Sequence, residues 1–349
     1  MSYIDNRTSM IREIQSIYSK DIPDYICELA NTPDLKRISE VSKNDGVELS
    51  SFNAFKYRYT LLDHSFGMAI ILDNFKQSKQ HIVEALFHEI ATPSFAFSEK
   101  YLKKYFKMTD FKEPGIFDKI VASENLFKNI FTGDISMSDA SNYKEFTLGF
   151  ADFPYLSANT LEYILSNGFF TRICDLREIE DLYENITILK NEDAKDEFGF
   201  TDINMARKFF KLSLEVGKKK RSYESKMARQ LISDVLMLMI RREDIDIWDL
   251  FKHTDKELLQ IGKNCTDKRI QEGCAMVEAL NQVYTKFNPT EDKTRYCVKV
   301  DEQSIYIDPL VKTKAGVFRL TQIDDSCEKA LQNYLETDTE LYMYIDYEL

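Results

Sequence analysis

Hydrophobic positions in the first half of the chain repeat with a helical period. His64–Phe75 and Ile82–Ile90 are both densely apolar, and the short polar run 76–79 separates them. This pattern predicts two neighbouring core helices, the second of which should end before Pro93. Nearer the N-terminus, the spacing of isoleucines between Met10 and Ala30 predicts short helices interrupted at Pro23.

A third core helix is predicted over Ser157–Ser166, with Ser157 as its N-cap and Asn167-Gly168 as its stop signal. Amphipathic helices are expected over Ile203–Val216 and Glu224–Ile240, and the capping box that begins at Thr254 predicts another. The chain up to about residue 288 is therefore expected to be helical.

After Asn288-Pro289 the period changes from helical to alternating. Strands are predicted at Tyr296–Val300, Ser304–Ile307, Val317–Leu320 and Leu341–Tyr347, and one helix at Ser326–Glu336. The fold class predicted is mostly α, with a helical core and a small α+β C-terminal region. Three domains follow: a helical domain over 1–215, a helical extension over 216–288, and the C-terminal region over 289–349.

Composition narrows the class of protein. The 349 residues are 44% hydrophobic and 30% charged, which excludes disordered and disulfide-stapled chains. A net charge of −12 argues against nucleic acid or an anionic membrane as the main partner. The six cysteines form no Cys-x-x-Cys pair, no stretch reaches the length of a membrane span, and no signal peptide is expected. The predicted location is the cytoplasm.

Two of the four histidines are candidate metal ligands. His64 opens one predicted core helix, and His88, followed by Glu89, closes the next. If the two helices pack antiparallel, these three side chains share one end of the pair. Two imidazoles and a carboxylate suit a divalent transition metal. The alternative is that both histidines lie at the edge of the core without any ligand.

The stretches Tyr59–Lys100 and Phe153–Gly168 resemble the HD superfamily of metal-dependent phosphohydrolases, in particular its deoxynucleoside triphosphate triphosphohydrolase-like branch. The resemblance lies in His-Ser-x-Gly from His64, in Leu-Phe-His-Glu-Ile-Ala-Thr-Pro-x-Phe around His88, and in LSANTLEYILSNG from Leu156. It implies an HD-type helical core whose metal ligands are His64, His88, Glu89 and Asn159. It also implies a divalent metal (Mn, Fe, Ni, Co, Zn or Mg), a nucleotide or phosphoester ligand, and a homo-oligomer.

The chain departs from this family at several positions. Glu89 and Asn159 stand where the family has Asp, so a site with two carboxylates has only one here. Leu61 and Thr160 stand where triphosphohydrolases commonly carry Arg, and Thr92 and Phe97 where they often place further histidines. Asp152, in the loop before Pro154, is an alternative source of the missing carboxylate, and Asp63 is a candidate to orient a histidine ligand.

Candidate substrate-binding residues are Arg58, Lys219 and Tyr163. Lys219 belongs to the one basic cluster, 218–221, for which a solvated helix end is the alternative interpretation. Two functions follow. The first is metal-dependent hydrolysis of a nucleotide or related phosphoester at an impaired site. The second is an inactive HD fold that serves as a nucleotide sensor or protein-interaction module.

Overall fold

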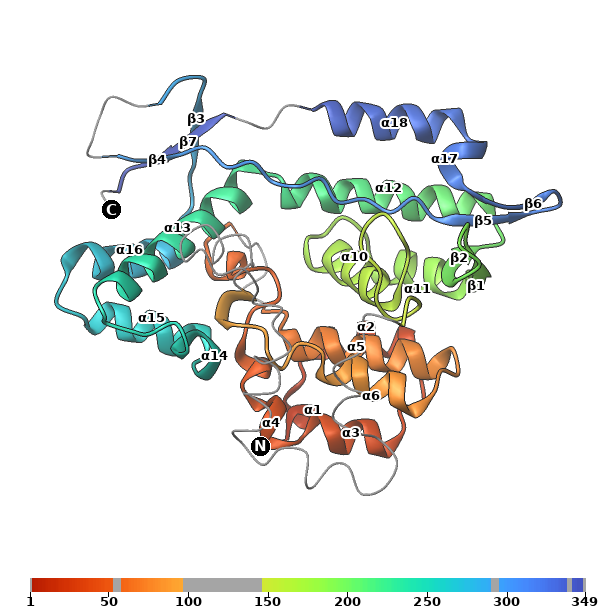
Figure 1. The fold of residues 1–349 in the computed structure, drawn as a ribbon, viewed down its shortest axis with the longest axis horizontal. Helices are drawn as coiled ribbons and strands as arrows, with labels where there is room; N and C mark the ends of the chain where they lie inside the picture. The colour runs from red at the N-terminus through yellow and green to blue at the C-terminus, as the bar shows by residue number, and fades with distance from the viewer. Residues whose placement is uncertain (1, 53–57, 97–145, 290–294, 338–340, 348–349) are drawn as a thin grey trace.

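The computed structural model describes residues 2–52, 58–96, 146–289, 295–337 and 341–347, and these are mostly helical, with two small sheets (Figure 1). The N-terminal helices are short, and Pro23 separates two of them as predicted. They are α1 (Tyr3–Asn6), α2 (Ser9–Tyr18), α3 (Asp24–Ala30) and α4 (Pro33–Lys36), followed by the 3₁₀ turns η1 (Ile38–Glu40) and η2 (Val47–Leu49).

The three predicted core helices are present: α5 (Leu61–Asn74), α6 (Lys79–Phe87) and α10 (Ala158–Phe170). Every residue of α5 from Leu61 to Leu72 is buried, which explains its dense hydrophobic run, because α2, α3, α6 and α10 all pack on it. Helix α10 has the predicted N-cap at Ser157 but continues past Gly168 to Phe170. Helix α6 ends before Ile90, because His88 is its C-cap and Ile90 N already donates to Phe87 O in a tight turn.

The remaining helices are α11 (Leu176–Glu184), α12 (Ile203–Lys220), α13 (Tyr223–Arg241), α14 (Asp249–Lys252), α15 (Asp255–Asn264), α16 (Lys268–Ala279), α17 (Leu320–Ile323) and α18 (Asp325–Glu336). Thr254 caps α15 as predicted. Helix α12 continues beyond Gly217 and through the basic cluster, so the predicted domain boundary at 215/216 falls inside it. Gly217 lies inside α12. A Cβ there would lie 2.3 Å from Ile305 O, so the glycine allows the chain at Ile305 to pack closely on the helix.

Strands are not confined to the last sixty residues, because β1, β2 and β3 precede them in the sequence. One sheet has the order β1-β2-β5-β6, and the other has the order β3-β7-β4. Their bounds are β1 (Ile186–Lys190), β2 (Asp196–Phe200), β3 (Tyr284–Lys286), β4 (Tyr296–Val298), β5 (Leu310–Thr313), β6 (Gly316–Arg319) and β7 (Tyr342–Ile345). The strand predicted at Ser304–Ile307 is absent, because the chain there runs along α12 and pairs only from Leu310 onward.

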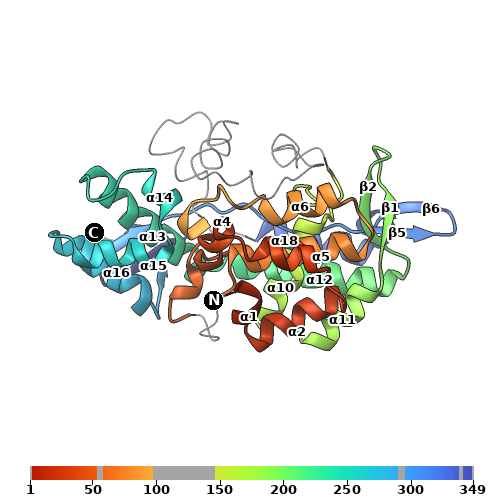
Figure 2. The same cartoon turned by 90° about the horizontal axis from the view of Figure 1, so that it is seen from below.

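The first sheet joins distant parts of the chain. Strands β2 and β5 pair in parallel, with Gly199 opposite Leu310 and Phe200 opposite Val311. A Cβ on Gly199 would lie 2.7 Å from Leu310 O, so only glycine allows this approach. The two sheets lie at opposite ends of the molecule, with the helical core between them (Figures 1 and 2).

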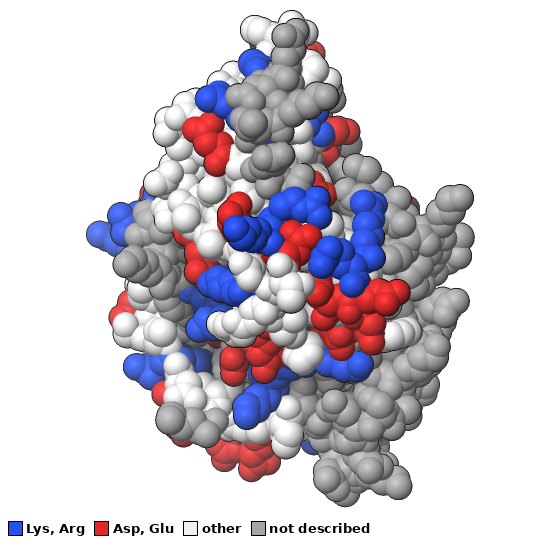
Figure 3. Space-filling view, turned by 90° about the vertical axis from the view of Figure 1, so that its left-hand side faces the viewer, with Lys and Arg blue, Asp and Glu red and all other residues white. Residues whose placement is uncertain are grey.

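None of the described helices is both long and apolar enough to cross a bilayer. All six cysteines are free thiols. On the face of the molecule at the α15–α16 end, basic and acidic side chains alternate over the described surface (Figure 3). That face therefore lacks the broad basic field that a nucleic-acid backbone requires.

Candidate metal centre and adjoining cavity

The four predicted metal ligands lie together where three helix ends meet. One ligand atom each of His64, His88 and Glu89 lies within 4.8 Å of the others. The Asn159 amide oxygen joins them, 3.0 Å from Nε2 of His64. The two imidazole rings are 5.5 Å apart, in an edge-to-face arrangement.

Helix ends bring these side chains to one place. A capping box between Thr60 and Asp63 starts α5, so that His64 lies on its first turn. His88 is the C-cap of α6, which packs against α5, and Asn159 lies on the first turn of α10. The start of α5, the end of α6 and the start of α10 thus supply the cluster.

Glu162 is a buried carboxyl behind His64 that the sequence analysis missed. Its Oε2 shares a hydrogen bond with His64 Nδ1, and its Oε1 accepts one from the Tyr59 hydroxyl. Burial raises the pKa of Glu162 to about 8. Gly67 makes room for this side chain, because a Cβ there would lie 2.9 Å from Glu162 Cγ.

Glu162 takes the place that the sequence analysis offered to Asp63. The Asp63 carboxylate does not contact His64; it accepts hydrogen bonds from the backbone and hydroxyl of Thr60 and from the Tyr3 hydroxyl. Its burial raises its pKa to about 6. Asp63 therefore caps a helix and does not orient a ligand.

The hydrogen bond between His64 and Glu162 changes direction with the ionisation of Glu162. Burial, together with the nearby charges of Lys43 and His88, holds the pKa of His64 well below its ordinary value, so the ring is neutral. Protonated Glu162 then donates to Nδ1, and Nε2–H donates to Asn159 Oδ1. When Glu162 is ionised, Nδ1–H donates to it instead, and Nε2 presents a lone pair to the cluster.

The ring of His88 has a fixed orientation. Its Nδ1–H donates to the Ala85 carbonyl oxygen at 2.7 Å, and its Nε2 lies 3.4 Å from Glu89 Oε1. Phe150 contacts the ring edge-to-face, with centroids 5.1 Å apart. His88 therefore faces the cluster with the nitrogen that a metal would bind.

Glu89 is ionised and already has a cationic partner. Lys43 Nζ lies 2.7 Å from Glu89 Oε1, and the Thr92 hydroxyl donates to Oε2. Burial alone would raise the pKa of Glu89, but the charges of Lys43 and His88 outweigh it and hold the pKa well below the usual range. The sequence analysis treated the polar stretch around Lys43 as a separator and did not anticipate this contact.

The donor set fits a divalent metal. Two imidazole nitrogens, one carboxylate and one amide oxygen suit Mn, Fe, Co, Ni or Zn, and both histidines have partners on Nδ1 that orient the rings. Asp152 does not restore the second carboxylate, because it is exposed and lies outside the cluster that the described residues form. Thr160 completes the capping box of α10, Leu61 is fully buried, and Phe97 lies outside the described residues.

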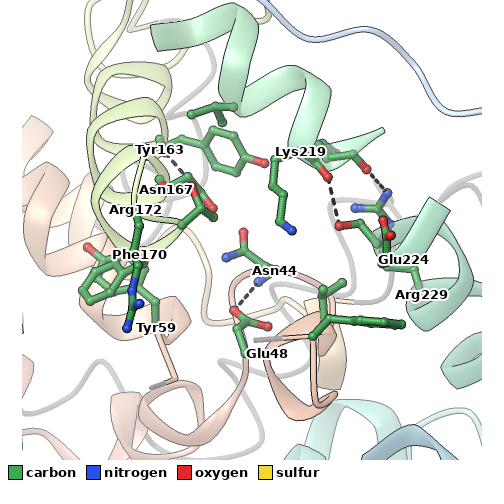
Figure 4. A pocket seen from close by; sticks show the side chains of 16 residues that line it. Asn44, Glu48, Tyr59, Tyr163, Asn167, Phe170, Arg172, Lys219, Glu224 and Arg229 are labelled. Carbon is green, nitrogen blue, oxygen red and sulfur yellow. Dashed lines mark hydrogen bonds between the residues drawn. The ribbon is translucent and has the colours of Figure 1, made fainter. Parts of the chain in front are cut away.

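A cavity of about 140 Å³, a volume comparable to that of a cavity that takes one benzene ring, lies near the cluster but is lined by none of the four ligands. Tyr163 and Asn167 of α10 face Asn44 and Glu48 across it (Figure 4). Tyr59 lines the cavity and its hydroxyl donates to Glu162, which also contacts His64, so Tyr59 and Glu162 link the cavity to the cluster.

Basic side chains predominate in the cavity wall, which includes Arg172, Lys219, Lys220 and Arg229 against Glu48 and Glu224. Two of the predicted substrate-binding residues, Lys219 and Tyr163, therefore line one cavity (Figure 4). The third, Arg58, does not line it. Its guanidinium is 2.6 Å from buried Asp255, which holds it in a structural ion pair, and it lines a separate cavity with Tyr3 and Thr60.

No protein-family model matches the chain, and no curated protein matches its sequence. A solved structure is similar: the crystal structure of a hypothetical protein from Aquifex aeolicus superposes with a TM-score of 0.65. The two chains are 12% identical, and the match covers 93% of each. At this identity the likeness supports the fold alone.

Proposed function

We propose that the chain is an HD-type protein that binds a nucleotide or related phosphoester and hydrolyses it with a divalent metal. The observation that carries this proposal is the His64–His88–Glu89–Asn159 cluster, to which a cavity rich in basic residues is linked through Tyr59 and Glu162. A ligand anchored in that cavity would be held near the cluster, and hydrolysis would require its scissile phosphate to reach past Tyr59 to the metal ligands.

The protein's own residues have distinct roles in this proposal. His64, His88, Glu89 and Asn159 would hold the metal, which when bound would polarise a phosphoryl oxygen and lower the pKa of a water molecule. Glu162 can give its proton to His64 Nδ1 while Nε2 releases its own proton to solvent, which leaves Nε2 free to be a ligand. Ala85 O keeps the His88 ring turned toward the cluster.

The cavity supplies affinity for the anionic part of the ligand. Lys219, Lys220 and Arg172 attract phosphate, and Tyr163 lies beside them, with its ring centroid 5.9 Å from Lys220 Nζ. Arg229 is nearly buried there, and it already has carboxylate neighbours, with Nη2 3.1 Å from Glu302 and Nε 3.9 Å from Asp45.

A specific observation favours the second function, a sensor without turnover. Glu89 is the only anionic member of the cluster, and its Oε1 is already paired with Lys43. A neutral amide at position 159 adds an oxygen but no charge. In that case the same cavity binds the nucleotide, and the cluster contributes only to its architecture.

The test is a hydrolysis screen of nucleoside mono-, di- and triphosphates with Mn²⁺, run in parallel with calorimetric binding of the same compounds. The variant is His88→Ala, and the matched control is His81→Ala, because His81 lies on the same helix but stacks on Phe146 outside the cluster. Turnover that His88→Ala abolishes and His81→Ala retains supports the hydrolase.

Binding without turnover, weakened by Lys219→Met and Tyr163→Ala, supports the sensor instead. Neither binding nor turnover with any compound would refute both functions. Mass spectrometry of Mn²⁺-loaded, dialysed protein tests metal binding independently of turnover. The wild type should retain Mn²⁺, and His88→Ala is the reference that should retain no ion.

A further inference from the structure

Lys43 is held at the cluster by its backbone as well as by its side chain. Its N–H donates to Tyr59 O at 2.9 Å, next to the bridge between Ser42 and Thr60. The Ser42 N–H in turn donates to buried Asp255 at 2.8 Å. The segment that carries Lys43 is therefore fixed against the start of α5, and its ammonium reaches Glu89 from there.

Both oxygens of Glu89 are already engaged. Oε1 is 2.7 Å from Lys43 Nζ, and Oε2 accepts the Thr92 hydroxyl. The pair is largely shielded from water, since the Lys43 and Glu89 side chains are 14% and 13% exposed. A metal ion bound to Glu89 at an ordinary metal–oxygen distance of about 2.1 Å would have the ammonium as its immediate neighbour.

We propose that Lys43 is the cluster's internal counter-ion and that a divalent metal binds only when the Lys43 ammonium leaves Glu89. This inference rests on the proposed metal site and adds the residue that sets its affinity. Two cations cannot share one carboxylate oxygen at these distances without strong repulsion, and the protein supplies no second carboxylate within the described cluster. Lys43 therefore weakens metal binding and, in the metal-free protein, stabilises the buried charge of Glu89.

The experiment is calorimetric titration of the full chain with MnCl₂ at one pH. Lys43→Met removes the ammonium, and Lys43→Gln is the second variant, because its amide can still donate to Glu89 and so supports folding. Lys263→Met is the matched control, since Lys263 forms a 2.8 Å pair with Glu278 at the surface. We expect Lys43→Met and Lys43→Gln to bind Mn²⁺ at least tenfold more tightly than the wild type, and Lys263→Met to bind as the wild type does.

Thermal unfolding provides a second readout. Without metal, Lys43→Met should unfold at a lower temperature than the wild type, and Mn²⁺ should raise its midpoint more than it raises that of the wild type. Equal Mn²⁺ affinity in the wild type and both Lys43 variants, lost in His88→Ala, would overturn this inference and leave the metal site standing. No Mn²⁺ binding by any variant would overturn the metal site and this inference with it.

Discussion

Gly67 lies where α5 passes closest to the Glu162 side chain of α10, and replacing it with alanine tests how the cluster is supported. A Cβ at position 67 would lie 2.9 Å from Glu162 Cγ and 3.1 Å from Oε1. Glu162 has little freedom to move away, because one of its oxygens binds Tyr59 and the other binds His64. The added methyl group should therefore disturb the support of His64.

Two opposing effects set the size of the change. In a helix interior, glycine is less favourable than alanine by about 1 kcal/mol, so Gly67→Ala would stabilise an unobstructed helix. Forcing one extra carbon into a packed core costs about 1–3 kcal/mol. We therefore expect Gly67→Ala to lower the free energy of unfolding by about 1 kcal/mol.

The assay is urea unfolding followed by circular dichroism on Gly67→Ala, Glu162→Ala and the double variant. Without the Glu162 side chain, the obstruction is gone, and Gly67→Ala should become stabilising by about 1 kcal/mol. A sign reversal between the two backgrounds is the expected signature. If Gly67→Ala stabilises the protein in both backgrounds to the same extent, the two residues are not coupled and the reasoning fails.

Three further predictions follow from buried charges. Burial raises the pKa of Glu48 in the cavity wall to about 7. Raising the pH through 7 therefore adds a negative charge there and should weaken sulfate binding measured by calorimetry, whereas sulfate binding by Glu48→Gln should depend less on pH between 6 and 8. Asp255→Ala should lower the free energy of unfolding by about 3 kcal/mol, because it leaves the guanidinium of Arg58 without its carboxylate; a loss below 0.5 kcal/mol in urea unfolding would contradict this. Arg319→Met should cost about 3 kcal/mol, because Glu197 is left buried beside an apolar chain, and the double variant with Glu197→Gln should recover part of the loss.

Local signals predicted the elements that carry the cluster. Long hydrophobic runs identified α5, α6 and α10, because each of these helices is buried on most of its surface. Only for α10 was the cap, Ser157, predicted; the caps Thr60 and Ser78 were missed, so α5 and α6 begin earlier than predicted. The short strands β1 and β2 gave no such signal. Each has only five residues, and they pair with each other, while β2 also pairs with β5 far along the chain, so the sheet depends on long-range packing.

The residues that surround the cluster were harder to predict than the ligands. A glutamate in an amphipathic helix usually faces water. Glu162 is buried because Gly67 of α5 leaves room for its side chain, a contact between two helices that local sequence does not indicate. Lys43 lies in a polar stretch with no periodic pattern, and its contact with Glu89 arises from two turns that meet in space. Charge pairing between distant loops leaves no trace in local sequence.

The parallel pairing of β2 with β5 has a consequence for folding. The strands come from opposite sides of α12–α16 in the sequence, so the sheet can close only after that long intervening segment has been ordered or looped out. Contacts of such high sequence separation slow folding. A nascent chain that lacks the residues after 300 would also expose the edge of β2, a site for mispairing with other chains. The β2–β5 pairing can therefore form only when synthesis of the chain is almost complete.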